Sequence, residues 1–424
     1  MADTKSNWLL VNHLDNKGTG TLTAVSATNA DDNFSTVQFS DTQASGKPHA
    51  PWFLGVQNQQ VILFDPVSKV ISFAESMPND AFPAYSYQDP HSNRIWFMND
   101  GDKDSGNDTL NCGDKGSTVT IIDKGDETTP PKHIKTLCVG RGHHVTTFIA
   151  PCENFPDLPK IAYVSNLLDG SISVVGNDPT DNENYLNILQ TINLCAPDKE
   201  KDGTTDIPNN AFPHGKQFSE ITGKVYSLNN GYGLVDVIDP ATHTIEHRIP
   251  FKGFSNLLLS RCGKYLIGKG ADRKSDAAHV LGNLAVIDAK TYEVVTKFNI
   301  LDLYPSTYRF NLPGDKLYVT SAATGKGEQK DNLSINTLYV YDSSQLPALT
   351  LIKTVEVGIA DCGRRPIAFP SDINSNLVFI PNPTDGTLSI VDGESDNIID
   401  TLTIANQGGN EFNFSFWQSS IYGA

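Results

Sequence analysis

The chain repeats one pattern of short strands and turns along most of its length. The clearest copy, KVYSLNNGYGLVDVIDPATHTIEHRIPF, runs from Lys224 to Phe251, and other copies begin at Lys160 and Asn376. Each copy reads as an apolar strand, an Asn or Asp-Gly turn, a strand ending in Asp and a last strand after Thr. Several short strands that recur about every 40–55 residues predict a β-propeller. That fold places equivalent positions of all blades around one axis, so distant residues can share a site.

Eight units can be drawn, but the second offers only three strands, so the sequence predicts seven or eight blades. We expect residues 1–424 to form a single all-β propeller domain. The first unit lacks an innermost strand, and EFNFSFWQSS from Glu411 supplies one, so the terminal blade combines residues from about 6–40 with 411–420. Closure by both termini avoids an open sheet edge. The later units begin near Ala84, His144, His214, Ser255, Thr307 and Arg365.

The charge balance limits the classes of partner. The chain has 32 Lys and Arg against 49 Asp and Glu, a net charge of −17. A field of that sign disfavours nucleic acid and anionic membranes as partners. We also expect no membrane span, because no apolar run approaches the roughly 18–20 residues that one needs. The sequence carries no information on oligomeric state.

The cysteines favour an oxidising compartment. Their number is even, no CxxC pair occurs, and Met is rare, with three residues in the chain. Cys112 and Cys138 flank one predicted strand pair, and Cys152 and Cys195 flank another, so each pair can close a loop; unpaired buried thiols are the alternative. We expect a periplasmic or extracellular protein. No secretion signal precedes Ser6, and we expect that Met-Ala replaces a removed leader.

The repeat also resembles a known family. Within Phe212–Phe251, Pro-His-Gly precedes the first strand, Lys-Val-Tyr opens the second and Val-Ile-Asp closes the third. This pattern resembles the YVTN type of β-propeller repeat, from about Ala84 to Ile404. The resemblance implies the fold more strongly than a function, because such repeats occur in surface proteins, in lactonase-like enzymes and in the copper-bearing propeller of nitrous oxide reductase. In that last relative, histidines at the inner strand ends hold the metal.

Histidines occupy equivalent positions in this repeat. Alignment of the units places three of them at the start of the innermost strand, where the last unit has Arg365. Three more are predicted on the same face of the propeller, beside this position, at the end of a strand in the first unit and in a loop of unit six. The register-matched residues are His49, His144 and His214, and the others are His143, His13 and His279.

Clustered imidazoles suit borderline metals, and three or more without a nearby thiolate favour copper or zinc with an open position. The histidines therefore predict a copper site at the mouth of the central channel. The alternative is structural: Pro-His-Gly is a turn whose imidazole bonds a backbone carbonyl.

A second candidate cation site lies in the loop of unit three, on the same predicted face. Asp100, Asp102 and Asp104 alternate along this loop, and Gly106 follows them. Alternating carboxylates on a tight turn resemble a calcium loop, although the glycine comes one place late and no Glu takes the twelfth position. A solvated acidic loop is the alternative.

Two classes of function follow. The first is a metal-binding propeller in which Arg365 or its neighbour Arg364 orients an anionic substrate or ligand. Catalysis at an open metal position would be redox or hydrolytic, and the expected partner is a small anionic molecule or a redox partner. The second is a non-catalytic binding or scaffold propeller with structural histidines. A lactonase-like hydrolase is less favoured, because the sequence shows no convincing acidic partner for it. Whether the protein is an enzyme stays open.

Overall fold

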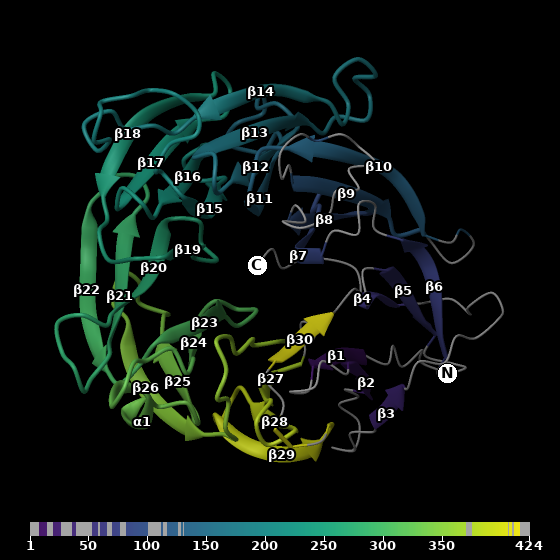
Figure 1. The fold of residues 1–424 in the computed structure, drawn as a ribbon, viewed down its shortest axis with the longest axis vertical. Coiled ribbons are helices and arrows are strands. Elements are labelled where there is room, and N and C mark those ends of the chain that lie inside the picture. The colour runs from purple at the N-terminus through teal and green to yellow at the C-terminus, as the bar shows by residue number, and fades with distance from the viewer. Residues whose placement is uncertain are drawn as a thin grey trace.

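The computed structural model describes residues 82–100, 112, 117–125, 129, 131–369, 375–405, 407–408 and 411–415, together with six strands before residue 82. Within these residues the strands form eight antiparallel sheets arranged around one centre, as Figure 1 shows. This arrangement is a β-propeller.

Most sheets contain four strands that are consecutive in sequence. The sheet of the termini comprises β3 (Thr36–Phe39), β2 (Gly20–Ser26), β1 (Trp8–Leu14) and β30 (Glu411–Ser415), and the next comprises β4 (Phe53–Gln57), β5 (Gln60–Asp65) and β6 (Val70–Ser76). The third has β7 (Phe82–Gln88), β8 (Arg94–Asp100), β9 (Ser117–Asp123) and β10 (Lys132–Val139), and the fourth has β11 (His143–Ile149), β12 (Ile161–Asn166), β13 (Ser171–Gly176) and β14 (Ile188–Asn193).

The remaining sheets follow the same order. They contain β15 (Pro213–Ser219), β16 (Lys224–Asn229), β17 (Leu234–Asp239) and β18 (Thr244–Pro250); β19 (Asn256–Leu259), β20 (Tyr265–Asp272), β21 (Leu281–Asp288) and β22 (Val294–Leu301); β23 (Pro305–Phe310), β24 (Lys316–Ser321), β25 (Thr337–Asp342) and β26 (Thr350–Glu356); and β27 (Leu377–Asn382), β28 (Thr387–Asp392) and β29 (Asn397–Thr403). A short helix, α1 (Gln329–Asn332), lies between β24 and β25. No helix of the described part is long and apolar enough to cross a membrane.

The predicted closure by both termini is confirmed. β30 pairs with β1 in antiparallel register, from Leu14 opposite Glu411 to Leu10 opposite Ser415. The second unit has three strands, β4 to β6, as the sequence predicts. In the last unit an isolated bridge between Ala368 and Phe379 takes the place of an innermost strand.

A buried asparagine explains why the second and third strands of a unit form a hairpin. The Asn166 Nδ2 atom donates hydrogen bonds of 3.0 Å to the hydroxyls of both Ser171 and Ser173. Asn382 makes the same pair of bonds, each 2.9 Å, to Thr387 and Ser389. These bonds satisfy a buried amide and fix the register of the hairpin.

The aspartate that ends the third strand organises the following turn. Asp239 Oδ1 accepts the Ala241 amide at 2.8 Å, and Asp288 Oδ1 accepts those of Lys290 and Thr291 at 2.8 and 2.9 Å. Such Asx turns compensate backbone groups that the strands leave unpaired. The repeated Val-Ile-Asp of the sequence is therefore a turn signal.

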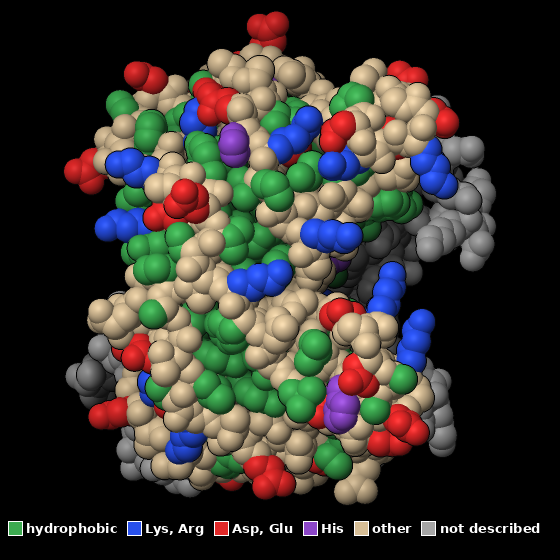
Figure 2. All heavy atoms as spheres, turned by 90° about the vertical axis from the view of Figure 1, so that its left-hand side faces the viewer, with side chains coloured by type: hydrophobic (Ala, Val, Ile, Leu, Met, Phe, Trp, Pro, Cys, Tyr) green, Lys and Arg blue, Asp and Glu red, His purple; other side chains and the backbone are tan. Residues whose placement is uncertain are grey.

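The core is a ring of clusters between neighbouring sheets. Ile149 and Tyr163 of the fourth sheet share one cluster with Val225 of the fifth, and Ile267 of β20 shares another with Leu317 of β24. Strands β12 and β13 are buried along their whole length, whereas most of β14 is exposed. The middle strands can therefore be continuously apolar, because both of their faces are covered. Figure 2 shows the outer surface, where acidic and basic side chains alternate with hydrophobic patches.

Candidate functional site: a cationic central cavity

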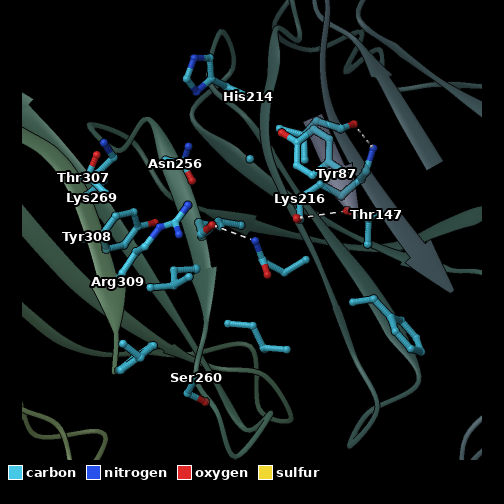
Figure 3. A pocket seen from close by; sticks show the side chains of 18 of the residues that line it. Tyr87, Thr147, His214, Lys216, Asn256, Ser260, Lys269, Thr307, Tyr308 and Arg309 are labelled. Carbon is cyan, nitrogen blue, oxygen red and sulfur yellow. Dashed lines mark hydrogen bonds between the residues drawn. The ribbon is translucent and has the colours of Figure 1, made fainter. Parts of the chain in front are cut away.

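The inner strands enclose a cavity of about 860 Å³, here called the central cavity. Its walls come from β7, β11, β15, β19 and β23, with Arg364 from the segment after β26. In Figure 3, His214 lies at one end of the drawn group and Ser260 at the other. The propeller topology thus brings five blades to one site.

Four of the five inner strands, all except β19, have an irregular register at their start. The register shifts between Pro83 and Tyr85, His143 and Thr146, Pro213 and Gly215, and Pro305 and Tyr308. Ala84, His144, His214 and Thr307, which the sequence alignment places at the start of the innermost strand, all lie within these shifts. Bulges of this kind re-aim side chains and are common beside functional sites.

His214 is a half-buried imidazole at one end of the cavity. Burial lowers its pKa, a backbone hydrogen bond with Ser255 opposes that effect, and the nearby charge of Lys269 lowers the pKa further. The ring is therefore mainly neutral at neutral pH.

Lys269, on β20, brings an amine to the cavity without an acidic partner. Its Nζ donates to the backbone oxygen of Pro305 at 3.1 Å and to that of Ser306, and it lies 5.4 Å from the ring centroid of Tyr308. Burial, and secondly the charge of Arg364, lower its pKa to about 7. The fold thus holds an amine that is partly charged at neutral pH.

Two arginines, Arg309 and Arg364, add further positive charge to the lining of the cavity. Arg309 extends from β23 towards the space between the walls (Figure 3), and burial followed by the charges of Arg364 and Arg261 lowers its pKa to about 10. Within the described residues, the guanidinium groups of Arg309 and Arg364 have no hydrogen bond or ion pair. The Arg364 guanidinium lies 5.4 Å from the ring centroid of Tyr85.

The opposite wall is different. Thr147, Tyr87 and Lys216 lie there, across from Lys269 and Arg309 (Figure 3). Lys216 is 2% exposed, and its amine donates to the Val145 carbonyl at 3.2 Å and the Ser165 hydroxyl at 2.9 Å. Burial lowers its pKa well below the usual value. Its amine is therefore bound within the protein, and this wall presents mainly neutral groups to the cavity.

Acidic side chains are scarce around the cavity. Among the described residues that line it, Glu220 is the only acid, against five Lys and Arg, namely Lys216, Arg261, Lys269, Arg309 and Arg364. The protein as a whole has a net charge of −17. The cavity thus concentrates positive charge inside an acidic protein, and low-dielectric walls focus such a field.

Arg365, predicted to contact a substrate, is a buried structural residue in this fold. It is 0% exposed, and its guanidinium donates to the carbonyls of Pro381 at 3.1 Å, Ile335 at 2.7 Å and Gly358 at 2.7 Å, and to Asn382 Oδ1. This geometry does not support a contact with substrate. Its neighbour Arg364, the alternative drawn from the sequence, lines the cavity.

Most of the predicted metal ligands lie beyond what the structure describes. His49, Asp102 and Asp104 are outside the described residues, and for His13, His143, His144 and Asp100 only the strand backbone is described. In the described part no group of three or more His, Cys, Asp or Glu can hold a metal ion. The copper and calcium sites therefore stay predictions.

His279, the last of the six histidines, is engaged away from the cavity lining. Its Nδ1 lies 2.9 Å from Asp302 Oδ1, and this hydrogen bond raises the pKa of His279. The imidazole thus links the β20–β21 and β22–β23 connections, which lie on the same face as predicted.

One of the two proposed cysteine pairs forms. Cys112 and Cys138 make a disulfide with a Cα–Cα distance of 5.3 Å. Cys152 and Cys195 are free, so that pairing was wrong. The reason is topological: they follow β11 and β14, which run in opposite directions, so the two thiols lie at opposite ends of the sheet. Strands of six residues separate them by about 20 Å, beyond the reach of a disulfide.

Lys269 and Arg309 were not predicted from the sequence. The available signal was a single basic residue inside each of two strands, YLIGKGAD and PSTYRF, with no acid directly beside it. A cation in that position is costly unless the fold or a ligand neutralises it.

No protein-family model matches the chain, and no curated protein sequence matches it. Several solved structures share its fold. The dihydro-haem d1 dehydrogenase NirN, in complex with DHE, aligns with a TM-score of 0.55 and 12% identity, over 86% of this chain and 66% of NirN. The chain thus spans slightly less than two thirds of NirN.

Two further structures align over about three quarters of this chain. Hydrazine synthase of Kuenenia stuttgartiensis gives a TM-score of 0.50 at 16% identity, over 77% of this chain and 87% of that one. The β-propeller domain of Cps50 (Swd1) from Myceliophteria thermophila gives 0.47 at 12%, over 75% and 85%. At these identities the likeness concerns the fold alone, and the YVTN-type resemblance stays a prediction.

Proposed function

We propose that the protein binds a small organic anion in the central cavity. The observation that carries this proposal is the set of Lys269, Arg309 and Arg364, which have no carboxylate partner among the described residues. Lys269 and Arg309 are partly buried, and such cations are destabilising unless they are paired, while Arg364 adds an exposed positive charge near them. An anion bound between them would neutralise this charge and would gain charge-assisted hydrogen bonds.

The size and lining of the cavity support an organic ligand. A volume of about 860 Å³ lies within the range of cavities that hold cofactors and metabolites. Tyr85, Phe148 and Phe218 add apolar surface to the polar groups of the lining. An inorganic ion would leave most of this surface without a contact.

The proposal is tested by binding measurements on the whole chain at low ionic strength. The panel contains aliphatic and aromatic carboxylates, phosphate esters and, because NirN is named as a dihydro-haem d1 dehydrogenase, haem-type compounds. We expect at least one member to raise the melting temperature and to bind in calorimetry, and Arg309→Gln to weaken it about tenfold or more. Lys264→Gln, on an exposed turn outside the lining, is the matched control. Absence of binding across the panel would overturn the proposal.

Copper binding by the histidines is the second candidate. The observation in its favour is that His144 and His214 occur in the same register shift of β11 and β15. Against it, Lys269 places a positive charge near His214. Equilibrium dialysis with copper decides: less than about 0.2 ion per chain, with an unchanged melting temperature, rejects this candidate. If His144→Ala and His214→Ala both keep the metal, the site lies elsewhere.

We further infer an eight-bladed propeller that works in an oxidising compartment. The eight sheets support the blade count, and the Cys112–Cys138 disulfide supports the compartment. Mass spectrometry of the unreduced protein from its native host tests the compartment, because a reduced Cys112 and Cys138 pair would contradict an oxidising one.

A further inference from the structure

Arg309 and Arg364 differ from several other basic residues near the interior, which have either a carboxylate partner or, in Lys216 and Arg365, side-chain hydrogen bonds to uncharged groups of the protein. Lys316 lies 2.6 Å from Asp396 Oδ2, and Arg141 lies 2.7 Å from Asp169 Oδ1. Arg248 is likewise paired with the buried Asp236 at 3.2 Å. These pairs show that the fold can provide a carboxylate where a basic side chain approaches the core.

Three basic side chains of the cavity make no ion pair with any described residue. Lys269 comes from β20, Arg309 from β23 and Arg364 from the segment after β26. Lys269 gives its hydrogen bonds to backbone carbonyls, which bear no net charge. Within the described residues, therefore, the positive charge of all three groups is left uncompensated.

Lys269 and Arg309 lie on the wall formed by β20 and β23, whereas Thr147 and Tyr87 face them from the other wall (Figure 3). Arg364 comes from a different segment and lies 5.4 Å from the ring centroid of Tyr85 on β7. A ligand that contacts all three cations therefore needs more than one anionic group. A single carboxylate can form a bidentate contact with one arginine, which leaves two cations without a partner.

We propose that the ligand of the central cavity is an organic anion with two or more negative charges, held by Lys269, Arg309 and Arg364 together. The inference rests on the proposed function and specifies its ligand class. Dicarboxylates, tricarboxylates and phosphate esters share the required chemistry. A monoanion would gain only part of the available electrostatic stabilisation.

A series of ligands that share one aromatic ring and differ in the number of carboxylates tests how the affinity depends on ligand charge. Benzoate, isophthalate and benzene-1,3,5-tricarboxylate have the same ring and carry one, two and three carboxylates. We measure their dissociation constants by calorimetry at pH 6.5 and constant ionic strength. We expect isophthalate to bind at least about tenfold more tightly than benzoate, and the tricarboxylate to bind more tightly again.

Substitutions in the cavity test which side chains cause the gain in affinity from benzoate to isophthalate. Arg309→Gln and Lys269→Met, with folding checked by circular dichroism, should each reduce the gain from benzoate to isophthalate to about threefold or less, while Lys264→Gln keeps the wild-type gain. Equal affinity for benzoate and isophthalate would overturn this inference and leave the proposed function intact. A gain that Lys264→Gln reduces equally would also overturn it. If no anion of either panel binds, the proposed function fails and this inference fails with it.

Discussion

The outer turns carry acidic side chains and the central cavity carries basic ones, and their surroundings have opposite effects on the stability of the charged form. Asp342 accepts the Ser344 amide at 2.8 Å, and hydrogen bonds from the hydroxyl and the amide of Ser344 lower the pKa of that carboxyl. In the cavity, burial lowers the pKa of Lys269 and Arg309. The carboxylate is stabilised in its charged form, whereas the cations are destabilised in theirs.

This difference indicates which charged side chains have only a structural role. Charges at the turns are completed by the protein's own amides, so they need nothing from outside. Charges in the cavity reduce the stability of the unliganded protein, and such costs concentrate at functional sites. Substitutions on the two sides should therefore differ in the sign of their effect on stability.

The largest effect is expected at Arg365, which is fully buried and whose guanidinium is hydrogen-bonded to the protein on each nitrogen. Arg365→Gln would leave carbonyls of three segments without a donor, so we expect the free energy of unfolding to fall by about 3–5 kcal/mol. Arg364→Gln, one residue away but exposed, should change it by about 0.5 kcal/mol or less. Urea denaturation of both variants tests the contrast, and similar losses in both would contradict it.

The next largest effect is expected in the pH dependence of anion binding. The pKa of Lys269 is about 7 in the free protein, and a bound anion should raise it, so binding takes up a proton. The affinity for isophthalate should then fall as pH rises above 7, by up to about tenfold per pH unit. The nearby His214 has a lowered pKa, so it stays neutral across this range.

Calorimetry between pH 6.5 and 8.5, in buffers of different ionisation enthalpy, measures both the affinity and the proton uptake. Lys269→Met should bind more weakly at pH 6.5 and lose the pH dependence. A wild-type affinity that is constant over this range would remove Lys269 from the site.

Local chemistry explains why the sequence predicts the fold so well. The Asp at the end of the third strand and the Asn at the end of the second make short-range hydrogen bonds, so each leaves a signal in every well-formed repeat. The pairing of β30 with β1 is long-range, but it follows from one missing strand at one terminus and one extra strand at the other.

The site is less predictable, because it depends on which side chains of different blades converge. Alignment of the repeats at the start of the innermost strand identifies histidines as candidate site residues. It does not identify Lys269, which lies on the second strand of its unit, or Arg364, which lies in a connection between units. A one-residue difference also decides between the roles of Arg364 and Arg365, since Arg365 is buried and Arg364 is exposed. Sequence periodicity does not specify that difference.

A smaller effect is expected at Arg309 in the absence of ligand. Arg309→Gln removes a cation that burial and the charges of Arg364 and Arg261 disfavour. We expect the free energy of unfolding to rise by about 1 kcal/mol, the usual trade between stability and function. Lys264→Gln should stay within about 0.5 kcal/mol of the wild type. A loss of stability in Arg309→Gln would assign this arginine a structural role.

The smallest effect is expected at the outer turns. Asp342→Asn keeps an oxygen that accepts the Ser344 amide and removes only the charge, so we expect the melting temperature to fall by about 1 °C at pH 7. Because hydrogen bonding lowers the pKa of this carboxyl, its contribution is present above the unfolded-state pKa of about 3.9 and is lost as pH falls through the folded-state value. Calorimetric scans at pH 7 and near pH 2.5 should therefore show a small difference that disappears in acid. A difference that persists in acid would mean that the turn depends on the geometry of the aspartate, and the contrast with the cavity would then concern shape as well as charge.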